Sequence, residues 1–148
     1  MRSILIAAFL FVLILNACCS KPVVEQDIEI TITEINCWLN LMPGGEPSFH
    51  YSGTFAVDRK FSDSFKFSAV KVFYKDEMIH QSQPLLQFYD ETITDSTSLI
   101  KFNFYSQQGI KVTEKMMRAE IADFILVFEI SGKTIEKSLK EIPITRAY

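Results

Sequence analysis

The sequence predicts an all-β protein, and three observations support this fold class. After residue 27, apolar residues alternate with polar ones along most of the chain, which is the period of a strand with one buried face. Turn-forming sequences such as YKDEM and ISGKT separate these segments at intervals of about 8–12 residues. Only residues 113–120 have the pattern of a helix, long enough for about two turns.

The first predicted strand, within residues 27–42, changes its alternation part-way. Ile28, Ile30 and Ile32 share one parity, whereas Ile35, Cys37, Leu39 and Leu41 share the other. A slip of one residue moves every side chain to the opposite face, so we expect a bulge or bend near Thr33 and Glu34. In sandwiches such a bend takes a strand from one sheet to the other, and we expect that outcome here.

The later segments complete the predicted sheet. Residues 43–47, PGGEP, form a loop, and residues 49–57 alternate again. Residues 65–74 and 121–130 are apolar on both parities, which is typical of central strands. About seven or eight strands with regular turns favour an immunoglobulin-like antiparallel sandwich with one short helix between late strands. The Cys…Trp…Cys pattern of antibody domains is absent, and a small barrel is the alternative.

Residues 1–17 predict a signal peptide in front of the folded domain. Arg2 supplies a positive charge, and an apolar run follows from Ile4 to Leu15. The run is shorter than the roughly 20 residues that cross a membrane, and it has the length of a signal-peptide core. Residues 18–26 then form a short tether, and residues 27–148 form one domain.

The sequence Leu15-Asn16-Ala17-Cys18 resembles the lipobox of bacterial lipoproteins, with an aliphatic residue three positions before the cysteine and a small residue directly before it. The resemblance implies cleavage before Cys18, a diacylglycerol thioether on its sulfur and an acylated amino terminus. Two or three acyl chains anchor a protein stably to a membrane. Because Cys19 rather than Asp follows the anchor, the resemblance implies the periplasmic face of the outer membrane.

Charge and cysteine content narrow the classes of partner. Removal of residues 1–17 takes away Arg2 and leaves 14 basic against 18 acidic residues, a net charge of −4. Nucleic-acid binding requires a basic surface, so this balance argues against it. Once Cys18 is acylated, Cys19 and Cys37 remain, and an oxidising periplasm would permit a disulfide between them. We favour the alternative, a free Cys37 packed in the core.

We expect a protein that is not an enzyme and that uses no cofactor. The two histidines, His50 and His80, stand in no nucleophile-elbow context such as G-x-S-x-G, and His50 lies on the polar parity of its strand. Met78 and His80 are two residues apart, which places them on one face of a regular strand, and this donor pair suits Cu(I). They are weak metal candidates, since methionine is a routine core residue.

Trp38 is the strongest candidate for a binding residue. It falls on the opposite parity from Cys37 and Leu39, and Asn36 and Asn40 flank it. An outward tryptophan between amides can stack on a sugar or anchor a protein partner. The alternative is a tryptophan covered by the following loop or packed in the core.

The loop at residues 43–47 adds two further binding candidates. Gly44 and Gly45 give its backbone the freedom to approach a ligand closely. We therefore expect a cell-envelope lipoprotein with a non-catalytic binding or structural module, whose partner is an envelope protein or a glycan. The alternative is a periplasmic carrier of copper or a glycan on the same β-scaffold.

Overall fold

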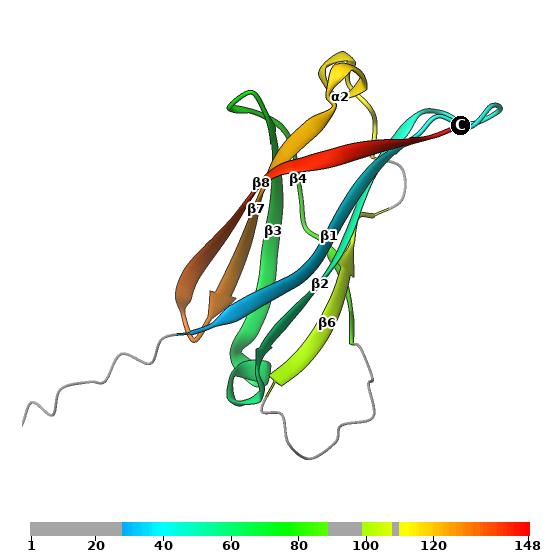
Figure 1. Ribbon diagram of the computed structural model, residues 1–148. Coiled ribbons are helices and arrows are strands. Elements are labelled where there is room, and N and C mark those ends of the chain that lie inside the picture. The colour runs from blue at the N-terminus through cyan, green and yellow to red at the C-terminus, as the bar shows by residue number, and fades with distance from the viewer. Residues whose placement is uncertain (1–27, 89–98, 108–109) are drawn as a thin grey trace, which may run out of the picture.

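The computed structural model describes residues 28–88, 99–107 and 110–148, and it confirms the all-β prediction (Figure 1). The strands are β1 (Ile30–Asn40), β2 (Ser48–Asp58), β3 (Phe65–Tyr74), β4 (Glu77–Ser82), β5 (Leu85–Phe88), β6 (Leu99–Tyr105), β7 (Ile121–Ile130) and β8 (Lys133–Ala147), with the 3-10 helix η1 (Arg59–Ser64) and helix α2 (Glu114–Arg118) between them. The expected signal peptide, tether and Cys18 anchor lie outside the described residues and stay predictions.

The eight strands form one continuous mixed sheet in the order β4-β3-β7-β8-β1-β2-β6-β5. All neighbouring strands are antiparallel except β1 and β8, which are parallel. The sheet curls so that its two halves face one another as an open half-barrel (Figure 1). The predicted sandwich topology is not confirmed, because β8 joins the two halves that a sandwich would keep as separate sheets.

β8 joins the halves because it bends at a bulge. Its first part pairs with β7, and Ile144 to Ala147 pair with β1 (red and blue in Figure 1). At the bend, Lys140 and Glu141 lie opposite the single residue Asp123, and Glu141 has a φ of 58°. The Asp123 carboxylate accepts hydrogen bonds from the Glu141 backbone N–H, at 2.8 Å, and from Lys140 Nζ, at 2.7 Å. These bonds hold the bulged backbone in place.

The bulge predicted in the first strand is present, but its predicted consequence was wrong. Ile32 pairs with Phe55 and Glu34 with Thr54, which leaves Thr33 as the extra residue of β1. β1 nevertheless stays paired with β2 on both sides of this bulge and does not change partner. The bulge resets which side chains face the core, whereas the crossing between the halves is made by β8.

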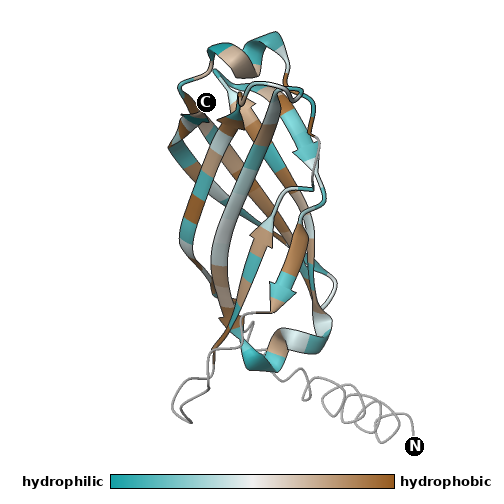
Figure 2. Cartoon of the chain, turned by 90° about the vertical axis from the view of Figure 1, so that its right-hand side faces the viewer, coloured by the Kyte–Doolittle hydropathy of each residue, from teal (hydrophilic) through white to brown (hydrophobic). Residues whose placement is uncertain are grey.

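Aromatic side chains from both halves fill the space between them. Phe55 on β2 lies with its ring centroid 5.6 Å from that of Phe67 on β3 and 5.3 Å from that of Phe128 on β7. Tyr51 meets Phe124 edge-on at 6.2 Å. The alternating teal and brown bands along the strands in Figure 2 are the sequence pattern that produces this one-sided burial.

One end of the core is covered by α2, which is shorter than the two turns expected. Its N-cap is Thr113, whose hydroxyl accepts a hydrogen bond from Met116 N at 3.3 Å. Met116 and Ala119 are buried with exposed fractions of 1% and 0%. Met116 is therefore a core residue and serves to close the apolar interior.

Candidate functional site

Trp38 lies on the outer face of β1, as its parity predicted. Its neighbours Cys37 and Leu39 are buried, with exposed fractions of 2% and 0%, whereas Trp38 is partly exposed and lies outside the core cluster. Across the sheet it is paired with His50 on β2 and with Thr145 on β8. The strand pairing thus places an aromatic side chain on the outer surface of the sheet.

A stacked ring pair forms the centre of this surface. The rings of Trp38 and His50 are nearly parallel, with centroids 5.3 Å apart and an interplanar angle of 12°. The His50 ring is held in turn by Ser48, whose Oγ lies 2.8 Å from His50 Nε2. The sequence placed His50 on the polar parity of its strand, but this contact was not predicted. The predicted loop, residues 43–47, would have paired Met42 with Ser48 and Trp38 with Ser52, whereas in the structure Asn40 pairs with Ser48 and Trp38 pairs with His50.

The loop at residues 43–47 lies next to this pair along the β1–β2 hairpin. Gly44 has a φ of 91°, a backbone conformation that favours glycine, and a Cβ on Gly44 or Gly45 would have no neighbour within 4 Å. The loop is exposed, as is Met42 before it. Leu41 N donates to the carbonyl of Ala147 at 2.7 Å, so the C-terminal end of β8 is tied to the same end of the sheet.

The amides on either side of Trp38 have intramolecular partners. Asn36 Nδ2 donates to Glu34 Oε1 at 2.7 Å, and Asn40 Oδ1 accepts from Met42 N at 3.2 Å. A sugar ring stacked on tryptophan is normally fixed by neighbouring polar groups that remain able to bond to its hydroxyls. Part of that capacity is used within the chain, so less of it is left to hold a sugar.

The outer face continues from β2 to the β5 edge through residues that the sequence analysis did not single out. Ser52 pairs with Tyr105 on β6, and Tyr105 pairs with Leu85 on β5. Tyr105 is exposed over 39% of its surface. Tyr105 alternates in step with Lys101 and Asn103, and these polar residues mark the outer side of β6. This shared alternation is the sequence signal that could have identified Tyr105 as an outer-face residue.

The strand register separates the two weak metal candidates, Met78 and His80. Val72 pairs with His80 and Phe73 pairs with Met78, so Ile79 is an extra residue in β4. Paired residues share a face and successive residues alternate, so Met78 and His80 lie on opposite faces. The shared face expected for a Cu(I) pair was therefore wrong, because that expectation assumed a regular strand.

His80 instead points into the molecule. Its ring lies edge-on to Phe49, with centroids 6.4 Å apart. Among the described residues, Nε2 of His80 is a buried polar side-chain atom without a hydrogen-bond partner. Burial lowers the pKa of His80, which keeps the ring neutral near pH 7.

Cys37 is a free, buried thiol, as the favoured interpretation had it. Its Sγ donates to the carbonyl oxygen of Pro143 at 3.4 Å. Burial raises the pKa of Cys37 to about 12, so the side chain stays protonated and unreactive. Cys19, the other half of the alternative disulfide, lies outside the described residues.

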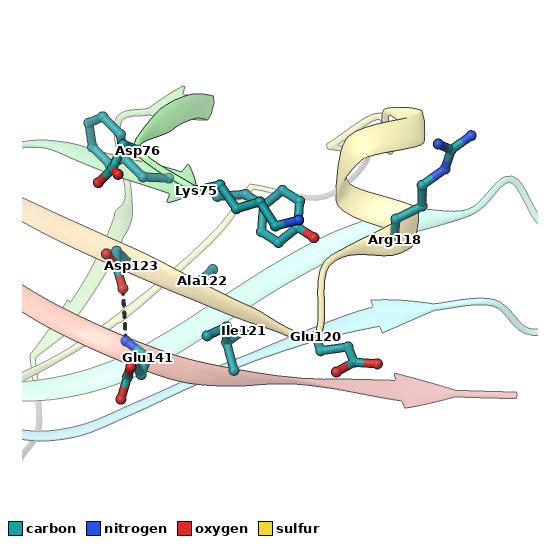
Figure 3. Close-up of a pocket in the computed structure, with 10 residues that line it drawn as sticks. Lys75, Asp76, Arg118, Glu120, Ile121, Ala122, Asp123 and Glu141 are labelled. Atoms are coloured by element: carbon teal, nitrogen blue, oxygen red, sulfur yellow. Dashed lines mark hydrogen bonds between the residues drawn. The ribbon is translucent and has the colours of Figure 1, made fainter.

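A separate hollow of about 570 Å³ opens between the β3–β4 turn and the start of β7. Lys75, Arg118, Glu120, Asp123 and Glu141 give it a mixed charge, and the Arg118 guanidinium points away from Asp123 (Figure 3).

The Asp123 carboxylate in this hollow forms its hydrogen bonds with residues of the β8 bulge. Hydrogen bonds from Lys140 and from the Glu141 backbone lower the pKa of Asp123 and hold it ionised. These contacts favour a structural role for the hollow. Over residues 28–88, 99–107 and 110–148, no three His, Cys, Asp or Glu side chains gather as a metal site would require.

Comparison with known proteins returns no relative. No family model matches the chain, and neither a curated protein nor a solved structure matches it. Within the described part of the chain, no helix has both the length and the apolar character needed to cross a membrane.

Proposed function

We propose that this chain is a non-catalytic binding module of the bacterial cell envelope, held to a membrane by lipid on Cys18. Its recognition surface is the outer face of β1 and β2 around Trp38, with the loop at residues 43–47 beside it. The partner is another envelope protein. A scaffold with a rigid sheet and one glycine-containing loop at its end is a common basis for recognition without chemistry.

The observation that carries the proposal is the stack of Trp38 on His50 at the surface of the sheet. Tryptophan is costly to leave in water, and it is enriched among the residues that dominate protein interfaces. Here the indole is outside the core cluster yet fixed by its neighbour, so it offers a large contact area with little conformational entropy to lose on binding.

Photo-crosslinking in living cells tests this surface. A photoreactive side chain replaces Met42, which is 57% exposed and follows the last residue pair of the β1–β2 hairpin, and adducts are compared between the native background and Trp38→Ala. We expect a discrete adduct that is lost in Trp38→Ala and strongly reduced in His50→Ala. A probe at Glu129, on the outer face of β7, is the matched control and should not give this adduct.

Stability measurements separate recognition from packing. A core tryptophan truncated to alanine costs about 3–5 kcal/mol, and we expect a smaller loss for Trp38→Ala. Ser138→Ala, exposed on the part of β8 that pairs with β7, should change neither stability nor the adduct. If Trp38→Ala unfolds the domain, or if the adduct persists in a folded Trp38→Ala chain, the proposed surface is wrong.

The anchor is tested independently by acyl labelling. Cys18→Ser should abolish incorporation of labelled fatty acid and leave the signal peptide uncleaved. Labelling that persists in Cys18→Ser and disappears in Cys19→Ser would move the anchor by one residue. If neither the native chain nor the variants incorporate the label, the lipoprotein assignment is wrong.

A further inference from the structure

The two edges of the sheet differ in how well they are protected against pairing with another strand. β4 carries the bulge at Ile79, and it begins at Glu77, which forms an ion pair with Lys115. Bulges and charges are the usual features that block edge pairing. β5 is a regular, uncharged strand, Leu-Leu-Gln-Phe, and in the described part of the chain its only strand partner is β6.

Exposed apolar side chains are concentrated at the β5 edge. Of the ten large hydrophobic residues exposed in the described part of the chain, five are on β5 and β6, namely Leu85, Leu86, Phe88, Leu99 and Tyr105. Leu86 and Phe88 pair with Phe104 and Phe102 on the inner side of the sheet. Leu85 and Gln87 lie on the outer side, opposite Tyr105 and Asn103. An added strand would therefore cover apolar surface on both faces.

We propose that β5 pairs antiparallel with β5 of a second copy of this chain, with Gln87 at the two-fold axis. In an antiparallel pair, directly opposite residues lie on the same face, so a symmetric pairing must be centred on a residue. Centring on Gln87 places Leu86 opposite the partner's Phe88 and sets the two amides against each other. Centring on Leu86 would set Pro84, which has no N–H, opposite the partner's Phe88.

A second copy fits this edge because β5 has no charge. Identical strands placed side by side repel when they carry like charges, and β5 brings none to the contact. Its apolar residues are distributed so that Leu86 and Phe88 exchange places across the axis. The contact is short, so the pairing is weak and depends on concentration, at the small end of protein interfaces.

Covalent trapping detects such a weak pair. The full-length chain with Gln87→Cys, purified in mild detergent, is treated with a short bis-maleimide, and crosslinked peptides are identified by mass spectrometry. Side chains opposite one another have Cβ atoms about 4.5–5.5 Å apart, so we expect a position-87 to position-87 link. Gln81→Cys, exposed on the β4 edge, carries the same native cysteines and is the control.

Charge substitution at the axis provides the second arm. Gln87→Lys and Gln87→Glu chains should each self-associate at least about tenfold more weakly than the native chain, and their mixture should pair again. Equal trapping at positions 81 and 87 overturns the proposal. So does self-association that is the same in all charge combinations, because the contact would then lie elsewhere. Thermal melts of each variant exclude misfolding as the cause.

Discussion

Gly53 is the residue whose replacement the structure restricts most directly. It lies on β2 beside the β1 bulge, and a Cβ there would be 2.5 Å from the backbone oxygen of Glu34 and 2.5 Å from the ring of Phe104. One contact is backbone and the other is a fully buried ring, so neither can move without disturbing the sheet or the core. The requirement for glycine here is steric.

We expect Gly53→Ala to lower the free energy of unfolding by at least about 2 kcal/mol, because over-packing a tight site costs about 1–3 kcal/mol and backbone is involved. Urea denaturation measures the change. Gly45→Ala is the matched control, since a Cβ there has no neighbour within 4 Å and the residue lacks a positive φ. A Gly53→Ala chain as stable as the control would contradict the described register of β1 and β2.

His80 should make stability depend on pH in a defined window. Burial lowers its pKa in the folded state below the ordinary value of 6.5. The unfolded chain therefore takes up the proton first as the pH falls, and stability is lost progressively below about pH 6.5. We expect the urea midpoint to fall between about pH 7 and pH 5, above the range where carboxylates such as Asp123 begin to protonate.

His80→Gln should flatten this pH dependence, because the variant has no ionisable group at the position. The same urea titrations are made on both chains, and each chain is compared with itself at pH 7. A loss of stability that the substitution causes at pH 7 therefore does not enter the comparison. An equal fall in the native chain and in His80→Gln would assign the pH dependence to another group.

At the scale of strands, the positions of irregularities decide what each strand does. The parity change after Ile32 located the β1 bulge from sequence alone, because one face of that strand is apolar. The bulge at Ile79 in β4 was not found, because residues 77–82 show no strict alternation that a change of parity could interrupt, and Met78 and His80 were placed on a regular strand. The β8 bend was missed for another reason. Glu141 adopts a positive φ without being glycine, and no local sequence pattern marks it.

Asp123 compensates for that conformation, and its removal should weaken β8. Asp123→Ala deletes the acceptor of the Glu141 N–H and the partner of Lys140, so we expect a loss of about 1–2 kcal/mol in urea unfolding. Glu129→Ala removes a part-buried bond to Ser68 and an exposed bond to Lys66 but leaves no backbone N–H of a bulge without its acceptor, so it is the control and should cost less than about 1 kcal/mol. A larger effect at Glu129 than at Asp123 would contradict the role given to the bulge.

For the molecule as a whole, the fold class followed from the alternating pattern, whereas the arrangement of the sheet did not. The pattern identifies strands and their buried faces, but strand order depends on pairings between distant residues. The parallel contact of β1 with β8 is such a pairing. The candidate site was predictable only in part for the same reason. Trp38 and its outward parity could be read from the sequence, but the stack on His50 required the hairpin register.

Removal of residues 142–148 should abolish cooperative folding. The deletion takes away Ile144, which is buried, and the β1–β8 pairing that joins the two halves. We expect a chain without a sigmoidal thermal transition by circular dichroism. Deletion of Tyr148 alone, which is 77% exposed, should leave the transition unchanged. A cooperative transition in the longer deletion would mean that each half folds independently.

The parallel pairing of the first and last strands also determines when folding can finish. The Thr145 hydroxyl donates to the Cys37 carbonyl across 108 residues of chain, so the middle of the sheet is completed only when the C-terminal strand becomes available. Long-range pairing of this kind slows folding. During synthesis, the nascent chain therefore cannot complete the middle of this sheet before residues 144–147 have left the ribosome. For a chain that is exported as we propose, this delay would favour translocation before the sheet is closed.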